Sequence, residues 1–442
     1  MKQQTVANNF IVLGFACLLL SISFGVIASF KYVLPYFPDE LLSFQHTRPL
    51  HVFLAISWIF ASVTGIMYRY IPEVAGKPLY SVVLANVHFL LQLGSIIIAV
   101  SGFFMGHFSG REYLEFPPWV TLIIFLYWIL FAVNFVMTVK PVLRTAPVYV
   151  WMWCTGLLFF LITIVEANLW LLPYFNNNIV RDITVQWKAN GSMVGAWNML
   201  IYGSTMYAMQ QITGDTKMGY NKVSFAFYFL GLTNLMFNWG HHTYVVPAHP
   251  AVKNVAYLIS MTELAFLANI MLNWRKSYNR LPVQAHRLSF QFFKMADIWI
   301  LLNLVLAIAI SIPYVNQYTH GTQITVSHAM GATIGINSLL LMGSVTFIFE
   351  KQLKTNLNRT ILLGLRVIHI SLLFFWFSLI GSGIMRAIAL YQHNYFAQVS
   401  ERMLPYLQLF SMSGIFLALG IGIVSITYIK VILSKVQGQV CA

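Results

Sequence analysis

The sequence predicts an all-α polytopic membrane protein, and three observations support this fold class. Hydrophobic residues make up 59% of the 442 residues and charged residues only 9%, whereas soluble domains carry about 25% charged residues. Apolar runs of about twenty residues recur along the chain, and each can cross a hydrocarbon core of about 30 Å as a helix. These runs are continuously apolar, without the ten-residue alternation of membrane barrels, so they favour helices.

The apolar runs predict twelve transmembrane helices, which place residues 1–442 in a single membrane domain. The first run follows only one charged residue, Lys2, and has no small-residue cleavage site, so it is expected to be a retained helix rather than a signal peptide. The predicted spans are 10–36, 48–72, 80–106, 118–139, 149–175, 189–209, 223–247, 251–274, 289–316, 323–349, 359–391 and 401–434.

The net charge of +14 is explained by membrane topology. With the N-terminus inside, most of the 26 basic residues fall in cytoplasmic loops and ends, which is the positive-inside bias. Both termini are therefore expected in the cytoplasm, and the expected location is the inner (cytoplasmic) membrane, in contact with lipid. The same distribution argues against nucleic-acid binding.

Other common chemical motifs are missing from the sequence. The three cysteines, Cys17, Cys154 and Cys441, are far apart and form neither a pairing pattern nor a metal-binding spacing. There is no phosphate-binding glycine loop, nucleophile elbow or zinc-protease motif. Histidines are the remaining candidates for a chemical site.

Several histidines fall at one depth under the twelve-span topology. His51 lies near the outer start of span 48–72, and Asn190 opens span 189–209 from the outside. The adjacent His241 and His242 lie near the outer end of span 223–247, and His328 just inside the outer start of span 323–349. Four helices thus present candidate ligands in the outer half of the membrane.

Such clustering is what a buried cofactor site requires, because neutral imidazole binds iron, copper or zinc well. Ionisable residues within membranes usually mark functional sites. The alternative for His241 and His242 is that water or lipid headgroups satisfy two interfacial histidines.

Of the acids, Glu166, Glu263 and Asp297 lie within spans. Glu263 and Glu166 are candidates to carry protons or organise water near the site, and Asp297 is expected to be structural. For Glu263 and Glu166 a local hydrogen bond to a neighbouring helix is the alternative.

Six stretches, in this order, carry a resemblance to a known family. The chain resembles the large, catalytic subunit of nitric-oxide reductases, in the haem-copper oxidase superfamily, over essentially its whole length. The resemblance implies a twelve-helix bundle of the haem-copper oxidase subunit I type. The stretches are HTRPLHVFLAISWIF (46–60), GREYLEFPPW (110–119), GAWNMLIYG (195–203), WGHHTYVVP (239–247), SMTELAF (260–266) and YTHGTQITVSHAMGA (318–332).

The resemblance also implies roles for individual residues. His51 would be an axial ligand of a low-spin haem b, and His328 the proximal ligand of a second, high-spin haem b. His241 and His242 would hold a non-haem iron. Arg111, Glu112 and His320 match positions near the haem propionates and a bridging calcium, while Glu263 matches a glutamate near the paired metals. Without the resemblance, Arg111 and Glu112 would be interpreted as an ordinary exposed ion pair with each other, worth about 0–1 kcal/mol.

The chain departs from the family pattern at both metal sites. Where the family has His-x-His, this chain has His328-Ala329-Met330. Met330 either ligates the low-spin haem together with His51, since His/Met ligation is known for haem iron, or it simply packs. The family's third metal-binding histidine and two following glutamates correspond here to Asn190, Val194 and Asn198. Asn190 remains only a weak ligand and a candidate catalytic residue.

The resemblance and the departures together leave several functions open. The first is a divergent nitric-oxide reductase-like enzyme that joins two NO molecules, 2 NO + 2 e⁻ + 2 H⁺ → N2O + H2O. Its electrons would come from a membrane-anchored cytochrome c partner, because the chain has no CxxCH haem-attachment motif. The second is a nitric-oxide dismutase-like enzyme (NO to N2 and O2), which the change of histidine to Asn190 resembles. The third is a catalytically impaired haem-binding paralogue, serving as a sensor or a structural protein. Oxygen reduction is disfavoured, because no cross-linked tyrosine–histidine element is identified.

Overall fold

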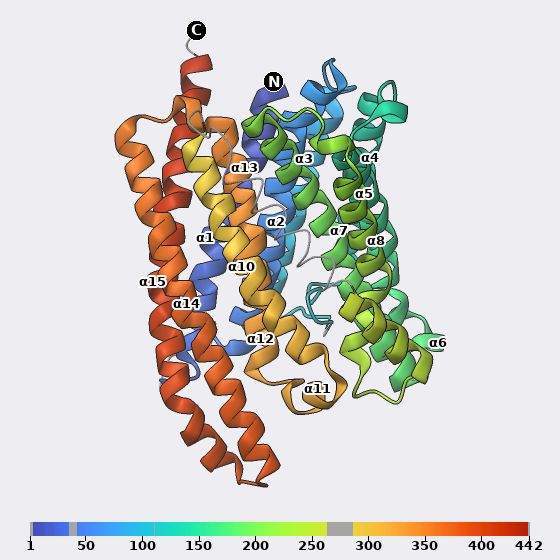
Figure 1. Cartoon of the computed structure of the whole chain (residues 1–442), viewed down its shortest axis with the longest axis vertical. Coiled ribbons are helices and arrows are strands. Elements are labelled where there is room, and N and C mark those ends of the chain that lie inside the picture. Colours follow the sequence, from blue (N-terminus) through green and yellow to red (C-terminus); the bar gives the residue numbers. More distant parts are fainter. Residues whose placement is uncertain (1–2, 35–41, 110, 263–285, 441–442) are drawn as a thin grey trace.

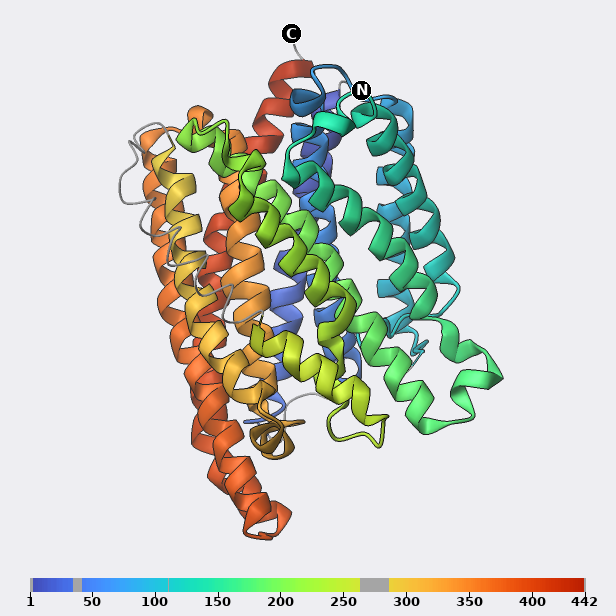
Figure 2. The same cartoon turned by 45° about the vertical axis from the view of Figure 1, so that its right-hand side comes forward.

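The computed structural model describes residues 3–34, 42–109, 111–262 and 286–440, and these residues form a helical bundle with no strand among them. Figures 1 and 2 show the long helices running side by side along the molecule, with the two termini at the same end. The predicted all-α class is confirmed.

Nine of the helices in the described ranges are long and apolar enough to cross a membrane, so the chain is a multi-pass membrane protein. The three remaining predicted spans correspond to α7, to α8 and to a helical segment that begins at residue 250. This segment is described as far as residue 262. The count of twelve therefore stays a prediction. The long helices are α1 (Gln3–Phe30), α2 (Phe44–Ala75), α3 (Val82–Phe104), α4 (Val120–Val139), α5 (Val148–Glu166), α7 (Ile179–Thr213), α8 (Lys222–Phe237), α10 (Arg287–Ser311), α13 (Leu339–Phe349), α14 (Thr355–Tyr391) and α15 (Phe396–Val440).

In three predicted spans the α-helix ends before the predicted boundary, and a short helix or 3₁₀ segment follows. The span predicted as 289–316 stops at Ser311, because Pro313 forces the preceding Ile312 into an extended conformation and starts the short helix α11 (Pro313–Thr319). Likewise α5 ends at Glu166, and Pro173 opens α6 (Pro173–Asn176). The span predicted as 223–247 is α-helical only to Phe237 and continues as a 3₁₀ segment, η4 (Asn238–Thr243).

The predicted span 323–349 is one continuous helical rod with an unusual centre. It begins as α12 (Gln323–Met330), widens into a π-helix, η5 (Gly331–Ser338), and continues as α13. Gly331 and Gly335 let this rod approach α10 closely, since a Cβ at these positions would lie 2.6 Å from Asn303 Oδ1 and 2.5 Å from the Trp299 ring. π-helical turns are rare and often occur at functional sites.

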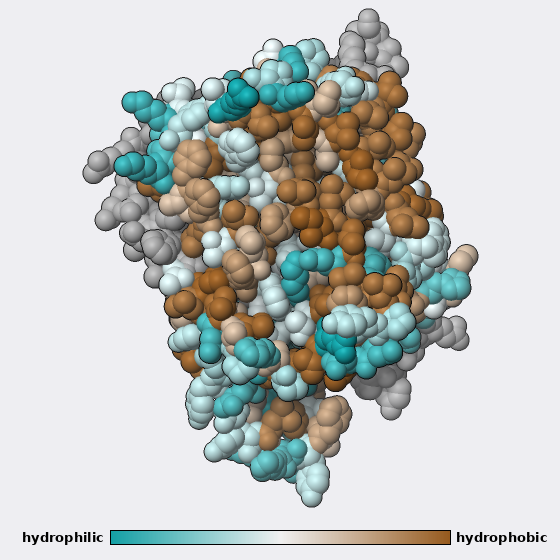
Figure 3. Space-filling model, turned by 90° about the vertical axis from the view of Figure 1, so that its right-hand side faces the viewer, coloured by the Kyte–Doolittle hydropathy of each residue, from teal (hydrophilic) through white to brown (hydrophobic). Residues whose placement is uncertain are grey.

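The packing of the bundle leaves one helix pair projecting from it. α14 and α15 pack along each other, and α15 also packs on α1. Their hairpin extends past the other helices at the end opposite the termini (Figures 1 and 2). On the face shown in Figure 3, hydrophobic side chains occupy a broad band between more hydrophilic ends, as a surface in contact with lipid requires.

Candidate metal and haem centre

The two adjacent histidines lie on η4, with their rings against each other and against α7. The ring centroids of His241 and His242 are 4.2 Å apart. The indole of Trp187 stacks on His242 at 4.6 Å and nearly parallel, at 7°. Trp187 lies one helical turn before Asn190 on α7 and therefore fixes the plane of His242 beside Asn190. The sequence analysis missed Trp187, because a stacking partner from another helix leaves no local signal.

Two glycines on α7 allow this approach. A Cβ on Gly191 would lie 2.6 Å from Trp239 Cβ, and a Cβ on Gly195 would lie 2.7 Å from Leu235 Cβ and 2.8 Å from its Cα. Small residues four apart let two membrane helices pack backbone to backbone. The Gly-x-x-x-Gly pattern at 191–195 thus positions η4, and with it His241 and His242, against α7.

Asn190 is buried, with 4% of its surface exposed, and its side-chain Nδ2 donates to the carbonyl oxygen of Glu112 at 3.4 Å. Val194 and Asn198 follow it on the same face of α7, at a spacing of four residues. In the ranges that the structure describes, no three His, Cys, Asp or Glu side chains are grouped to hold a metal ion. Any metal here would therefore rely on His241 and His242 as its strong protein ligands.

His328 lies near the end of α12, at the start of the π-helical turn. His241, His328 and His320 are all close enough to His242 to interact with it electrostatically. Four histidines from three chain segments, η4, α12 and the loop before α12, therefore converge in this region. Met330 is two residues further along, about 200° around the helix from His328, and packs partly buried against the core. His328 and Met330 thus face different sides of the rod.

Unpartnered polar atoms surround this part of the rod. In the described ranges, His328 Nδ1, Asn303 Oδ1 and Trp376 Nε1 are buried without a hydrogen-bond partner. The last two belong to α10 and α14, and both abut Gly331. Leaving such atoms unpaired costs about 1–3 kcal/mol each, and a bound water, ion or polar group is a common explanation. A polar partner for these atoms would lie where α10, α12 and α14 meet, beside His328.

His51 is held by α1 in the orientation that a haem ligand needs. Its Nδ1 is 2.8 Å from the carbonyl oxygen of Ser21, so Nδ1 carries the proton and donates. The other nitrogen, Nε2, is then the one that can bind iron, as is usual for metal-ligating histidines. The imidazole lies over Gly25, where a Cβ would be 2.7 Å from Nδ1.

His51 and Met330 lie at a similar depth in the bundle. Trp58 Nε1 donates to Ser338 Oγ at 3.0 Å, which fixes the register between α2 and the π-helical turn. His51 precedes Trp58 by seven residues and Met330 precedes Ser338 by eight, and the two helices run in the same direction. Sequence counting of spans predicted a common depth for His51 and His328, two residues before Met330. The hydrogen bond of Trp58 joins α2 to the π-helical turn at this depth.

Arg111 and Glu112 do not pair with each other, so their interpretation as a simple ion pair is wrong. Arg111 binds Asp182 Oδ1 at 2.6 Å and Gln186 Oε1 at 3.1 Å on α7. Glu112 pairs with Arg48 on α2 at 3.0 Å, and Arg48 also holds Glu115 at 2.6 Å. Arg111 therefore binds α7 and Glu112 binds α2, so the loop that carries both residues is linked to the two helices. Sequence analysis missed Arg48 and Asp182, because both are distant in the chain.

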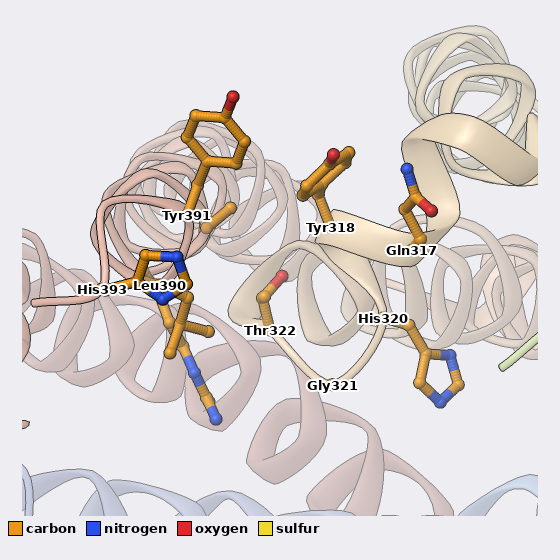
Figure 4. A pocket seen from close by; sticks show the side chains of 10 residues that line it. Gln317, Tyr318, His320, Gly321, Thr322, Leu390, Tyr391 and His393 are labelled. Carbon is orange, nitrogen blue, oxygen red and sulfur yellow. The ribbon is translucent and has the colours of Figure 1, made fainter.

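His320 lines a cavity of about 640 Å³ at the end of the bundle opposite the termini. Figure 4 shows Tyr318 and Tyr391 toward one side of this cavity and His320 at the other. Arg386 and His393 of the projecting hairpin also line it, and His393 has a positive φ of 56°, rare for a non-glycine residue. Burial lowers the pKa of His320, while the negative charge of Glu112 opposes that change. Arg386 is a cationic group that sequence analysis did not single out.

The three acidic residues predicted within spans are Glu263, Glu166 and Asp297. Glu263 lies outside the described residues. Glu166 forms an ion pair with Lys188 of α7, so its carboxylate is engaged between two helices. Asp297 lies within α10.

Comparison with known proteins identifies the family and the fold of the chain. Residues 5–416 match the family model described as cytochrome c and quinol oxidase polypeptide I. A relative, a nitric oxide reductase subunit of Stutzerimonas stutzeri, is 25% identical over 373 residues, which cover 78% of this chain and 75% of that protein. A cryo-EM structure of a heme-copper terminal oxidase dimer has a similar fold, with a TM-score of 0.76 and 14% identity, covering 98% of this chain and 84% of that one.

Proposed function

Because this chain belongs to the cytochrome c and quinol oxidase polypeptide I family, we propose that it is a divergent nitric-oxide reductase-like enzyme. Family membership makes it a membrane oxidoreductase of the haem-copper oxidase superfamily. The finer proposal is that two b-type haems and a modified non-haem metal site convert 2 NO, two electrons and two protons to N2O and H2O. The convergence of His241 and His242 with His328 carries this proposal.

The residues around the two candidate haem positions fit such groups. His51, with Nδ1 committed to Ser21, would offer Nε2 to the low-spin haem b, and Met330 would be its second ligand. His328 would be the ligand of the high-spin haem b. Arg111, Glu112 and His320 would bind the propionates and a calcium ion, and the cationic Arg386 beside His320 suits carboxylate groups as well.

The non-haem iron would be held by His241 and His242, with Asn190 as a weak third ligand. When bound, the haem and the iron would bind NO and supply the electrons. The protein's part is to hold the ligands in place. Trp187 keeps His242 in one plane, and the buried Asn190 shields the α7 side of the site from solvent. Glu263 would take part in proton delivery.

The electron donor proposed for this enzyme is a membrane-anchored cytochrome c subunit. Enzymes of this family accept electrons from cytochrome c or quinol. The chain carries no CxxCH motif of its own, so in this proposal a separate haem c protein delivers electrons to the haem at His51.

Purified protein tests the proposal directly. Two haems and one non-haem iron per chain, with NO consumption that requires an electron donor and forms N2O, support it. Oxygen release from NO without a donor would instead show a dismutase, the alternative favoured by Asn190 in place of histidine. One haem or none, with no NO consumption, would show an impaired haem-binding paralogue.

A repair variant examines the non-haem site separately. Asn190→His restores a strong third ligand on the same face of α7, so iron occupancy should rise. Asn198→His, two turns further from η4, is the matched control and should leave occupancy unchanged. No rise in the Asn190→His variant would mean that the site no longer holds iron in this way.

A further inference from the structure

The cavity beside His320 lies at the depth where the hydrocarbon core of a membrane ends. Arg366 and Arg386 on α14 are twenty residues apart in the sequence, with no Asp, Glu, Lys or Arg between them. At a rise of 1.5 Å per residue they lie about 30 Å apart along the helix, which is the thickness of the hydrocarbon core. Arg386 lines the cavity, so the cavity lies at headgroup depth, at the end of the bundle opposite the termini.

A row of three tyrosines lies along this cavity and joins α11 to α14. The ring centroids of Tyr314 and Tyr318 are 5.6 Å apart, and those of Tyr318 and Tyr391 are 6.0 Å apart. Tyr314 is 71% exposed and Tyr391 70% exposed. Tyrosines are enriched at the headgroup level of membranes, because the ring is apolar while the hydroxyl bonds to polar groups. Tyr318 and Tyr391, which line the cavity, therefore offer it two hydroxyl donors (Figure 4).

The cavity also carries a positive charge without a counter-charge. Among the described residues that line it, none is acidic. The half-buried Arg386 has no hydrogen bond or ion pair in the described ranges. Arg402, on the same hairpin, instead donates to Gln392 Oε1 at 3.0 Å. A guanidinium at the edge of a cavity, with its five donors unused, is well suited to bind a phosphate.

An exposed apolar row on α14 leads along the membrane to this cavity. Ile370, Phe377, Ile384 and Ile388 are all exposed. Their spacings of seven, seven and four residues keep them on one face of the helix. Tyr391 follows three residues after Ile388 and also lines the cavity. The lipid-facing side of α14 therefore ends at the cavity.

A second exposed apolar row lies on α10. Val305, Ile308 and Ile312 are exposed, and their spacings of three and four residues place them on one face. The helix α11 follows this row directly, and both α10 and α11 pack against α14. The cationic cavity is thus bordered by two apolar rows. A phospholipid combines the same features, an anionic phosphate and two acyl chains.

We propose that this cavity binds the headgroup of an anionic phospholipid, whose acyl chains lie along α10 and α14. The guanidinium of Arg386 pairs with the phosphate, and the hydroxyls of Tyr318 and Tyr391 donate to the headgroup oxygens. The guanidinium also suits a haem carboxylate, and the proposal assigns it to the lipid. A soluble anion would match the charge but would leave both apolar rows uncovered. The site does not depend on the reaction, because none of these contacts involves the metal centre.

Native mass spectrometry of the full chain in detergent tests the proposal. Phosphatidylglycerol and phosphatidylcholine with identical acyl chains are titrated separately against the protein. One phosphatidylglycerol should bind more tightly than phosphatidylcholine. Arg386→Gln should weaken the binding of phosphatidylglycerol at least about tenfold, the size expected for loss of a hydrogen bond between charged groups. Tyr391→Phe, which keeps the ring and loses the donor, should weaken it by about fivefold.

Arg402→Gln is the matched control, because it removes the same charge from the same hairpin outside the cavity. Its affinity for phosphatidylglycerol should equal that of the native chain. Equal losses in Arg386→Gln and Arg402→Gln would reveal general surface attraction and overturn the proposal. Competition by soluble glycerol phosphate at the same concentration would show a free-anion site and also overturn it. If Arg386→Gln lost haem and still bound phosphatidylglycerol normally, the guanidinium would belong to a haem carboxylate.

A cryo-EM map of the native chain in phosphatidylglycerol nanodiscs decides the question without any variant. Phosphate density is expected within hydrogen-bond distance of Arg386, continuous with acyl-chain density beside Ile388 and Ile312. An empty cavity, or density of a protein segment in it, would refute the proposal.

Discussion

At the scale of single residues, the histidine ligands depend on neighbours that are distant in sequence. His51 needs Ser21 to fix its tautomer and Gly25 to make room for its ring. His242 needs Trp187 to hold its plane. A metal-binding histidine without such support loses about 10–100-fold in affinity, so the ligand residues alone do not make the site.

Gly25→Ala should remove the low-spin haem. The added Cβ would lie 2.7 Å from His51 Nδ1 and 2.9 Å from Cε1, so the ring must move and lose its bond to Ser21. The haem content per chain should fall from about two toward one, measured by a pyridine haemochrome assay. Gly94→Ala on α3, where a Cβ meets nothing within 4 Å, should keep its haem. Full haem content in Gly25→Ala would contradict this account of His51.

The free energy of unfolding should decrease in acid because of His286, which lies just before α10. Burial lowers the pKa of its imidazole below the ordinary value of 6.5, and the positive charge of Lys351 lowers it further. The carboxylate of Glu350, whose Oε2 is 3.7 Å from His286 Nδ1, attracts the proton but does not reverse this lowering of the pKa. The folded protein therefore binds this proton less readily than the unfolded chain. The stabilising contribution is complete above pH 6.5 and is lost as the pH falls below it.

Thermal unfolding in detergent between pH 8 and pH 5 measures this effect. His286→Gln should flatten the decline in melting temperature below pH 6.5, because glutamine does not titrate. His249→Gln, at an exposed position, is the control and should keep the native slope. An unchanged slope in His286→Gln would show that other groups dominate the acid response.

At the scale of elements, the close contact between α7 and α8 decides where η4 lies. Gly191 and Gly195 bring the two helices together, and η4 continues directly from α8. The two histidines are thus placed by a helix–helix contact and not by their own loop. The 3₁₀ geometry of η4 sets adjacent residues about 120° apart, in place of the 100° expected for an α-helix.

Gly195→Ala should therefore disturb the metal site without touching a ligand. Its Cβ would lie 2.8 Å from Leu235 Cα, a backbone atom that cannot rotate away. Overpacking of this kind costs about 1–3 kcal/mol, so both the melting temperature and the iron content should fall. Gly422→Ala on α15, where a Cβ meets nothing within 4 Å, should change neither. Leu235→Ala added to Gly195→Ala should not restore iron if the backbone clash is responsible.

At the scale of the whole molecule, orientation in the membrane follows from charge. The two termini lie at one end, and the α14–α15 hairpin projects at the other (Figure 1). The positive-inside bias predicts that the termini lie in the cytoplasm. The hairpin tip, where Tyr395 and Phe396 are strongly exposed, is then expected outside.

Cysteine labelling checks this orientation in intact cells. In a Cys441→Ser background, Tyr395→Cys should react with a membrane-impermeant maleimide added outside. Ser434→Cys, at the other end of α15, should react only after the membrane is opened. Cys17 is buried and should stay unlabelled in both cases. The reverse pattern would invert the topology.

The amino-acid sequence was sufficient to predict the fold class and the candidate ligands. Long apolar segments must become helices in lipid, because every backbone polar group there has to be satisfied within its own segment. That requirement is local, so hydropathy predicted the nine helices of the described ranges that are long and apolar enough to cross a membrane. Counting them placed His51, His241, His242 and His328 at one depth.

The contacts that support those ligands could be found only in the folded molecule. The contacts of Trp187 with His242, of Trp58 with Ser338 and of Arg48 with Glu112 join helices far apart in the chain. The π-helical turn after Met330 and the 3₁₀ segment carrying the histidine pair were also not predicted. Hydropathy reports the transfer of a segment into lipid, whereas side-chain pairing depends on which helices pack together and in what register.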